Sequence, residues 1–317
     1  MSLSIDVVLV VYNQYDLTDS CLRHLAAQTR EHRVIVVEHG STDDSRASLK
    51  RDWAQHTLIE IDVNGPLSAA TNRGVTAGTG DVIVWINNDV DARPDFLEKL
   101  VAPLEADPAA GSVASLMLQP GGDVIDSMGL TADVTLAGFP RLQWQPAANA
   151  TAAEPVLVGP SGTAAAYRRS AWDAVGALDE NITAYSEDLD LALRLRGAGW
   201  AAAAAPDAIG THLGSTTYGH RSSRQRTHGG FSRGYLLRRY GVLRGRVGVR
   251  ALVTEALVCG GDLVISKDLE ATKGRLRGWH AARGLPRHEA PPLAALDRAM
   301  SFRDSIALRR AVYALPR

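Results

Sequence analysis

The chain has 317 residues, of which 45% are hydrophobic and 22% are charged. This composition is ordinary for a soluble globular protein and excludes global disorder. The formal net charge of -1 gives no overall attraction to nucleic acid or to a membrane. The length accommodates one large α/β domain with an appendage, or two modest domains.

The two cysteines, Cys21 and Cys259, lie among apolar residues in predicted helices, and neither belongs to a Cys-x-x-Cys pair. We therefore expect neither a zinc site nor a disulfide framework, and a reducing cytoplasm fits best. The N-terminal segment lacks the basic region and cleavage site of a signal peptide. No apolar run reaches the about 18 residues that span a bilayer. These features predict a cytoplasmic protein.

The first half of the chain alternates predicted strands and helices, and its valine-rich runs are typical of strands buried on both faces of a parallel sheet. We expect strands at residues 5–11, 33–38, 58–63 and 81–86, with helices from about Leu17 and over residues 68–78. This order implies right-handed crossovers and an open parallel sheet. Ligands of such sheets bind beyond the carboxyl ends of the strands.

Polar residues follow three of these strands, in the segments 12–13, 38–41 and 87–91. Asp89 and Asp91 are spaced to bind a hard divalent cation, which would neutralise a diphosphate leaving group. The alternative is a loop of turn-forming residues that only stops the strand.

Three further residues near the predicted sheet edge are candidates for binding a nucleotide. Glu38 could accept the N3–H of a uracil or thymine base, or could only cap the neighbouring turn. Asn72 and Arg73 lie near the start of a predicted helix and could face phosphates, a base or simply solvent.

A second acidic cluster, Glu187, Asp188 and Asp190, falls in the first turn of a predicted helix. The helix dipole and an i,i+4 pair between Asp190 and Arg194 account for part of this pattern, with Ser186 as the cap. Three acids in four residues exceed what capping requires. A carboxylate here could take the proton from an attacking hydroxyl.

His212 follows a predicted strand of small residues, 201–211. A lone histidine is usually a surface residue or a satisfied core residue. It would be a third metal ligand if the fold brought it to Asp89.

Together these motifs resemble the family-2 inverting glycosyltransferases of GT-A fold, over about residues 4–216. Among relatives, the chain is most similar to bacterial rhamnosyltransferase-like enzymes. The resemblance rests on the order of several segments, which are VVLVVYN, VVEHGSTDDS, NGPLSAATNRG, INNDVDARPDFLEKL, GPSGTAAAYRRSAWDAVGALDENITAYSEDLDLALRLRGAGW and THLGSTT.

The resemblance implies an α/β fold of GT-A type, with a mostly parallel central sheet in a domain of residues 1–217. It implies transfer of a sugar, with rhamnose as a candidate, from a UDP- or dTDP-linked donor by one in-line displacement that inverts the anomeric carbon. No covalent enzyme intermediate is needed. In this scheme Asp188 is the general base beside Glu187.

The implied cofactor is Mn²⁺ or Mg²⁺, held by Asp89, Asp91 and His212. The implied donor-nucleotide residues are Val11, Tyr12, Asn13, Glu38, Asn72, Arg73 and Asn88. Two positions depart from the family pattern. Asn87 stands at the first position of the DxD-like motif, and Glu38 replaces the usual base-binding aspartate.

Residues 218–317 form a second region, which we expect to be basic and mainly helical. Residues 213–254 include no acidic residue, and arginines recur there. A polyprenyl-linked acceptor at an anionic inner membrane face, or the donor diphosphate, would suit these arginines. Nucleic acid is not expected, because no binding motif accompanies the charge. A solvated helix face or a homodimer contact is the remaining explanation.

Other functions are less consistent with the sequence. A nucleotidyltransferase or a dehydrogenase would need a Gly-rich phosphate loop after the first strand, and none is present. A non-catalytic nucleotide-sugar-binding module remains the alternative, because Asn87 replaces an acid. The Glu187-Asp188 pair argues against it. The acceptor, which could be a lipid-linked saccharide, a glycan, a protein or a small molecule, is not identified.

Overall fold

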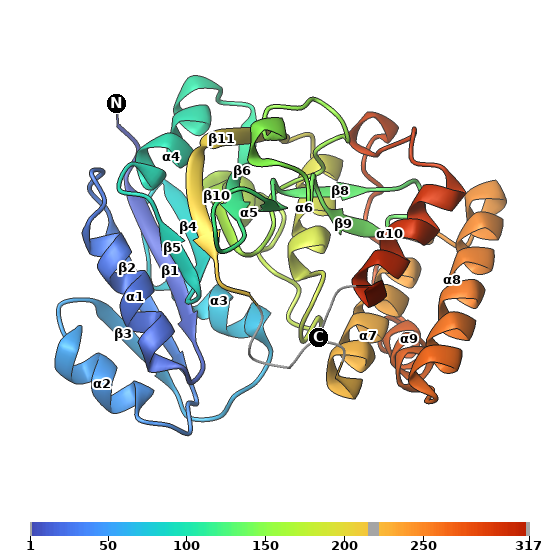
Figure 1. Ribbon diagram of the computed structural model, residues 1–317, viewed down its shortest axis with the longest axis horizontal. Coiled ribbons are helices and arrows are strands. Elements are labelled where there is room, and N and C mark those ends of the chain that lie inside the picture. The colour runs from blue at the N-terminus through green and yellow to red at the C-terminus, as the bar shows by residue number, and fades with distance from the viewer. Residues whose placement is uncertain (1, 215–221, 315–317) are drawn as a thin grey trace.

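The computed structural model describes residues 2–214 and 222–314. A large mixed sheet forms the left and centre of the molecule in Figure 1, with strand order β3-β2-β1-β4-β10-β6-β11-β5 and β7 paired to β6. A separate hairpin joins β8 to β9. The strands are β1 (Ile5–Val11), β2 (Arg33–His39), β3 (Thr57–Ile61), β4 (Val82–Asn87), β5 (Val90–Ala92), β6 (Ala110–Leu118), β7 (Ile125–Ser127), β8 (Leu130–Ala132), β9 (Gly138–Pro140), β10 (Ala164–Arg168) and β11 (Ala201–His212).

Helices cover both faces of the sheet because its central strands carry apolar side chains on both sides. Leu9 of β1 belongs to a core shared with α1 (Tyr15–Ala26) and α4 (Phe96–Ala106). Val8 faces the opposite side, in a core shared with α3 (Leu67–Thr76), α5 (Arg169–Ala174) and α6 (Glu187–Gly197). The predicted α/β fold and its parallel β3-β2-β1-β4 half are confirmed.

The second half of the sheet differs from a purely parallel arrangement. β10 runs antiparallel to both β4 and β6, and β5 runs antiparallel to β11. All nine residues of β6 are buried. The segment after β4, for which a loop of turn-forming residues was the alternative, contains β5.

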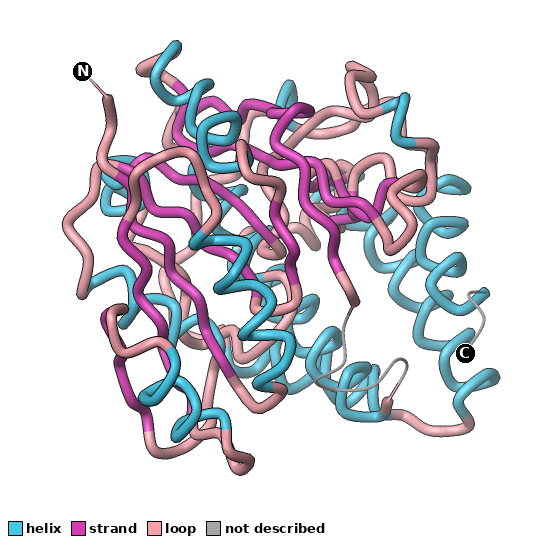
Figure 2. The backbone as a smooth tube through the Cα atoms, turned by 60° about the vertical axis from the view of Figure 1, so that its left-hand side comes forward, coloured by secondary structure: helices cyan, strands magenta, loops and turns pink. Residues whose placement is uncertain are grey.

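The C-terminal region consists of α7 (Ser223–Arg239), α8 (Gly245–Ser266), α9 (Glu270–Ala281) and α10 (Phe302–Ala314), as predicted for a helical extension. Figure 2 shows these helices grouped beside the sheet. Glycines allow α7 and α9 to pack backbone against backbone, because a Cβ on Gly278 would lie 1.9 Å from the carbonyl oxygen of Phe231. The expected boundary at residues 217 and 218 lies outside the described residues.

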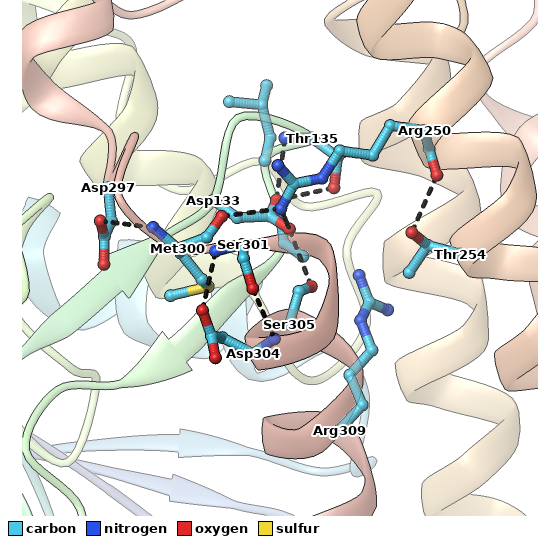
Figure 3. A network of polar contacts seen from close by, with 12 residues as sticks. Asp133, Thr135, Arg250, Thr254, Asp297, Met300, Ser301, Asp304, Ser305 and Arg309 are labelled. Carbon is cyan, nitrogen blue, oxygen red and sulfur yellow. Dashed lines mark hydrogen bonds and ion pairs between the residues drawn. The ribbon is translucent and has the colours of Figure 1, made fainter.

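The helical region shares its core with the sheet domain. Leu193 of α6 packs in one cluster with Tyr235 and Tyr240. Asp133, after β8, accepts a hydrogen bond from Ser305 of α10 at 2.8 Å and lies 3.5 Å from Arg250 of α8 (Figure 3). Burial alone would raise the pKa of Asp133, but the hydrogen bonds from Thr135 and Ser305 and the charge of Arg233 lower it. The C-terminal helices are therefore anchored to the sheet domain by a buried charge.

Within residues 2–214 and 222–314, no helix combines the length and the apolar character required to cross a membrane.

Candidate active site

A pocket of about 180 Å³ opens at the carboxyl ends of β1, β2 and β4, where the sequence predicted a ligand site. Its lining includes Tyr12, His39, Asn88 and Glu187. The structure thus brings the predicted donor residues Tyr12 and Asn88 together with one acid of the second cluster. The amide of Asn88 also donates to Thr18 of α1 at 3.0 Å.

Asp89 and His212 lie side by side because β5 and β11 pair next to them. His212 is opposite Val90 in the register, and the carbonyl of Asp89 accepts a hydrogen bond from Leu213. Oδ2 of Asp89 lies 3.3 Å from Nε2 of His212. The other carboxylate oxygen of Asp89 is buried and has no hydrogen-bond partner among the described residues.

The second nitrogen of the His212 ring contacts a carboxylate that the sequence did not indicate. Nδ1 lies 2.8 Å from Oδ2 of Asp126, on β7. Burial alone would lower the pKa of His212, but the hydrogen bonds with Asp126 and Asp89 raise it to about 10. A carboxylate on the outer nitrogen is the usual partner of a metal-binding histidine, because it fixes the tautomer and the ring orientation.

These residues fit a divalent metal ion. They offer a carboxylate oxygen without a partner and an imidazole nitrogen held in place, and Mn²⁺ accepts both donor types. The structure places the other predicted ligand, Asp91, against α1. Its carboxylate contacts Ser20 at 2.8 Å and His24 at 3.3 Å instead of His212.

A second group of residues lies close enough together to hold a metal ion, namely Asp179, Asp190 and His288. Arginines already neutralise its carboxylates. Arg194 binds Asp190 at 2.7 Å, which confirms the predicted i,i+4 pair, and Arg239 contacts His288 at 2.6 Å. Such cations oppose metal binding, so we interpret this group as an ion-pair network between α6 and the C-terminal helices.

The acidic pair Glu187-Asp188 begins α6. Its preceding residues, Tyr185 and Ser186, both have left-handed backbone conformations, with φ of 64° and 65°. Ser186 therefore occupies the N-cap position without the side-chain cap expected of it. Strained residues of this kind cluster at functional sites. The two carboxylates are consequently placed by backbone geometry and not by ordinary capping.

The two carboxylates have different surroundings. Asp188 accepts hydrogen bonds from the backbone of Gly162 at 2.9 Å and of Leu189 at 2.7 Å, while burial raises its pKa. Oε2 of Glu187 is buried and has no hydrogen-bond partner among the described residues. Burial and the nearby charge of Asp188 raise the pKa of Glu187 to about 8. At neutral pH this arrangement can hold a proton on Glu187.

Glu38 and Asn13 join the loops that follow β1 and β2. Glu38 is fully buried, and its two oxygens accept from the backbone of Ser41 at 2.6 Å and from Arg46 at 2.5 Å. Asn13 donates its N–H to Ser41 and accepts from Thr42. Glu38 therefore caps a turn, as the alternative interpretation proposed, and any contact with a base would have to share these oxygens. Val11 is buried in the core.

Asn72 and Arg73 do not line this pocket and do not lie near the start of a helix, and the exposure of Arg73 fits the alternative in which it faces solvent. They occupy the middle of α3. Asn72 donates to the carbonyl of Leu178 and accepts from its N–H, at 2.9 and 3.0 Å. Arg73 is exposed. The amide of Asn72 thus holds the segment leading toward α6.

The described arginines of the basic stretch mainly form internal pairs. Arg233 is buried, binds Glu255 at 2.7 Å and donates to the carbonyls of Thr135 and Leu136. Arg226 pairs with Asp268. Arg226 and Arg233 therefore have partners supplied from other segments, whereas Arg244 and Arg246 are exposed. His220 and Arg221 lie outside the described residues.

The mixed sheet with helices on both faces has the GT-A fold, which solved structures share. A mannosyltransferase from Pyrobaculum calidifontis in complex with GDP-Man and Mn²⁺ aligns with a TM-score of 0.55 at 17% identity, over 99% of this chain and 86% of that one. GalNAc-T7 with UDP, GalNAc and Mn²⁺ aligns with a TM-score of 0.57 at 12% identity, over 72% of this chain and 47% of that one.

The chain belongs to glycosyl transferase family 2, whose family model matches residues 6–176. It is 29% identical over 229 residues to N-acetylglucosaminyl-diphospho-decaprenol L-rhamnosyltransferase of Mycobacterium tuberculosis, which covers 65% of this chain and 75% of that protein. It is 24% identical over 205 residues to the O-antigen biosynthesis protein RfbC of Myxococcus xanthus, over 62% of this chain but 16% of that protein. The predicted resemblance to family-2, rhamnosyltransferase-like enzymes is confirmed.

Proposed function

We propose that this glycosyltransferase moves a sugar from a UDP- or dTDP-linked donor to an acceptor hydroxyl, with inversion at the anomeric carbon. One connection carries the proposal. Asp188 accepts from the N–H of Gly162, and the next residue, Thr163, accepts through its carbonyl from the N–H of Asn87. Two adjacent residues thus link the acidic pair to the DxD-like segment beside the pocket.

In the proposed reaction Asp188 accepts the proton of the acceptor hydroxyl, whose oxygen forms a bond to the anomeric carbon. The bond from that carbon to the diphosphate breaks on the opposite face, and the electron pair leaves with the diphosphate. Asp89 and His212 would hold Mn²⁺ or Mg²⁺, which supplies positive charge to the departing diphosphate. Glu187 keeps its proton and thereby limits repulsion beside Asp188.

The donor and acceptor to test first follow from the similar proteins. The name of the M. tuberculosis relative specifies L-rhamnosyl transfer to a lipid-diphosphate-linked saccharide. We propose dTDP-rhamnose as the first donor, a lipid-linked saccharide as the first acceptor class and the cytoplasm as the location. Asp91 could bind the metal only if its carboxylate gave up its contacts with Ser20 and His24 of α1.

A thermal-shift panel of UDP, dTDP, GDP and CDP, each with and without Mn²⁺, tests the donor site. A ligand at about 100 times its Kd stabilises the folded state by about 2.7 kcal/mol. We expect a metal-dependent shift with UDP or dTDP. No shift with any nucleotide would contradict the donor site. A shift without turnover on any acceptor would favour the non-catalytic binding module.

A further inference from the structure

The helix α8 is oriented with its polar side chains inward and its apolar side chains outward. Every exposed residue between positions 247 and 265 is apolar or glycine. Val249, Leu257 and Val264 are 64%, 54% and 77% exposed. The helix forms the right-hand edge of the molecule in Figure 1, away from the sheet. A solvent-facing helix normally has the reverse arrangement.

Polar residues on the inward face of α8 prevent the helix from rotating about its axis. Thr254, Glu255 and Asp262 are all buried. Glu255 binds Arg233 and Arg275 at 2.7 and 2.8 Å, which fixes the rotation of α8 about its axis. The apolar face is therefore held outward by buried ion pairs, and it requires a partner that removes it from water.

Positive charges surround this apolar face. Arg244 and Arg246 are exposed at its N-terminal end, and Lys267 is exposed at its C-terminal end. On the neighbouring helix α9, Arg277 is also exposed. On α8, on α9 and in the turn between them, the carboxylates are unavailable for pairing with a partner's cations, whereas Asp304 on α10 is exposed. Those of Glu255 and Asp262 are buried, and those of Asp268 and Glu270 contact Arg226 and Lys273.

We propose that the apolar face of α8, with its rim of cations, docks the enzyme onto an anionic lipid bilayer. An apolar stripe with basic residues at its edges suits the boundary between acyl chains and negatively charged headgroups. The 22 residues of α8 make it about 33 Å long. Because only one of its faces is apolar, the helix would lie along the surface. An adjoining apolar groove of about 570 Å³, which includes Leu257 and Ile306, widens the contact.

A second copy of the chain is a poorer partner for this face. An antiparallel pair of α8 helices would bring Arg244 and Arg246 of one copy toward Lys267 of the other. A parallel pair would bring the arginines toward each other. Both arrangements place these like charges together.

Vesicle flotation of the full chain tests the proposal, which concerns binding and does not depend on turnover. The two preparations are phosphatidylcholine alone and phosphatidylcholine mixed with phosphatidylglycerol. We expect binding to the anionic vesicles that weakens as salt is raised. The double variant Leu252→Gln/Leu257→Gln should bind at least about 100-fold more weakly, because two exposed apolar side chains are lost. Val63→Gln, at an exposed valine after β3, is the control.

The rim is tested by Arg246→Gln/Lys267→Asn. Asparagine is chosen because position 267 has a left-handed backbone, with φ of 56°. Each removed cation should weaken binding about fivefold, and Lys99→Gln on α4 should have no effect. Equal binding to neutral vesicles, or no vesicle binding at all, would overturn the proposal. A dimer in sedimentation velocity that Leu252→Gln/Leu257→Gln abolishes, without vesicle binding, would assign the face to a second copy. Circular dichroism and thermal melting verify that each variant folds.

Discussion

Nε2 of His212 lies 3.3 Å from Oδ2 of Asp89, and these two side chains come from segments 123 residues apart that β5 and β11 bring together. The pair joins the DxD-like segment to the end of the last strand of the sheet domain. Asp126 holds the far side of the imidazole at 2.8 Å. The histidine is therefore fixed in position between two carboxylates before any metal binds.

Replacing Asp126 by asparagine should weaken Mn²⁺ binding about 10–100-fold, because outer carboxylates orient a metal-binding histidine and raise its basicity. Isothermal titration of Mn²⁺ into the nucleotide-bound protein measures the effect. Asp123→Asn, an exposed aspartate three residues away, is the matched control. An unchanged Mn²⁺ affinity in Asp126→Asn would remove Asp126 from the site.

Metal binding should release a proton. The carboxylates of Asp89 and Asp126 raise the pKa of His212 to about 10, so the imidazole is charged at neutral pH without metal. A metal needs the neutral imidazole, so Mn²⁺ affinity should rise with pH up to about that value. Titrations in buffers of different ionisation enthalpy should show about one proton released per Mn²⁺. Identical enthalpies in all buffers would show that His212 does not exchange its proton for the metal.

The sequence predicted those parts of the fold whose signal is local. The bounds of β1 agree with the expected strand, because seven apolar or buried residues in succession satisfy a strand covered on both faces. The three-residue strands β5 and β7 are too short to show any periodicity. They nevertheless position Asp89 and Asp126, so this part of the site depends on pairings that only the folded chain reveals.

The same limit applies to the side chains of the candidate site. Asn72 lies within the segment NGPLSAATNRG, but the direction of its side chain depends on where residues 178–180 pass α3. Glu38 was placed correctly at the sheet edge, whereas its partner Arg46 belongs to α2 (Ser45–Asp52) and could not be identified by spacing. Asp190 and Arg194 were paired correctly because both lie on one helix.

Replacing Asp188 by asparagine should lower turnover about 10²–10⁴-fold, the usual contribution of a general base. The amide keeps the size of the side chain, so the affinity for a nucleoside diphosphate should change little. Turnover and nucleotide binding are measured on the same preparation, with Asp173→Asn as an exposed control. Retained turnover would exclude Asp188 as the base, whereas unaltered binding with no turnover in the parent protein would favour the binding module.

Glu187 should make the parent protein less stable as pH rises. Its pKa is raised from 4.5 to about 8, so the folded chain holds a proton that the unfolded chain has lost. The free energy of unfolding should therefore fall between these two pKa values by an amount on the order of a few kcal/mol. Glu187→Gln, which imitates the protonated acid, should reduce this slope. Urea unfolding at several pH values measures it, with Glu154→Gln as an exposed control. Equal slopes in both proteins would mean that Glu187 is ionised throughout.

The stability that Glu255 contributes should depend on pH in the opposite direction. This carboxylate should determine the stability of the C-terminal helices. It lies 2.7 Å from Arg233, 2.8 Å from Arg275 and 3.4 Å from Arg309. Burial alone would raise its pKa, but the three arginines lower it to about 2. Because the folded pKa is below the ordinary 4.5, the stabilisation is complete above about pH 4.5 and is lost as pH falls toward 2.

Glu255→Gln leaves the three guanidinium groups facing one another without a counter-charge, so it should cost about 3–5 kcal/mol of unfolding free energy at neutral pH. The difference between the two proteins should shrink as the pH falls below 4.5, because the parent then protonates the same group. Glu289→Gln, on an exposed segment, should match the parent at every pH. A loss below about 1 kcal/mol, the range of surface pairs, would show that the arginines find other partners. The outward orientation of α8 would then not depend on this carboxylate.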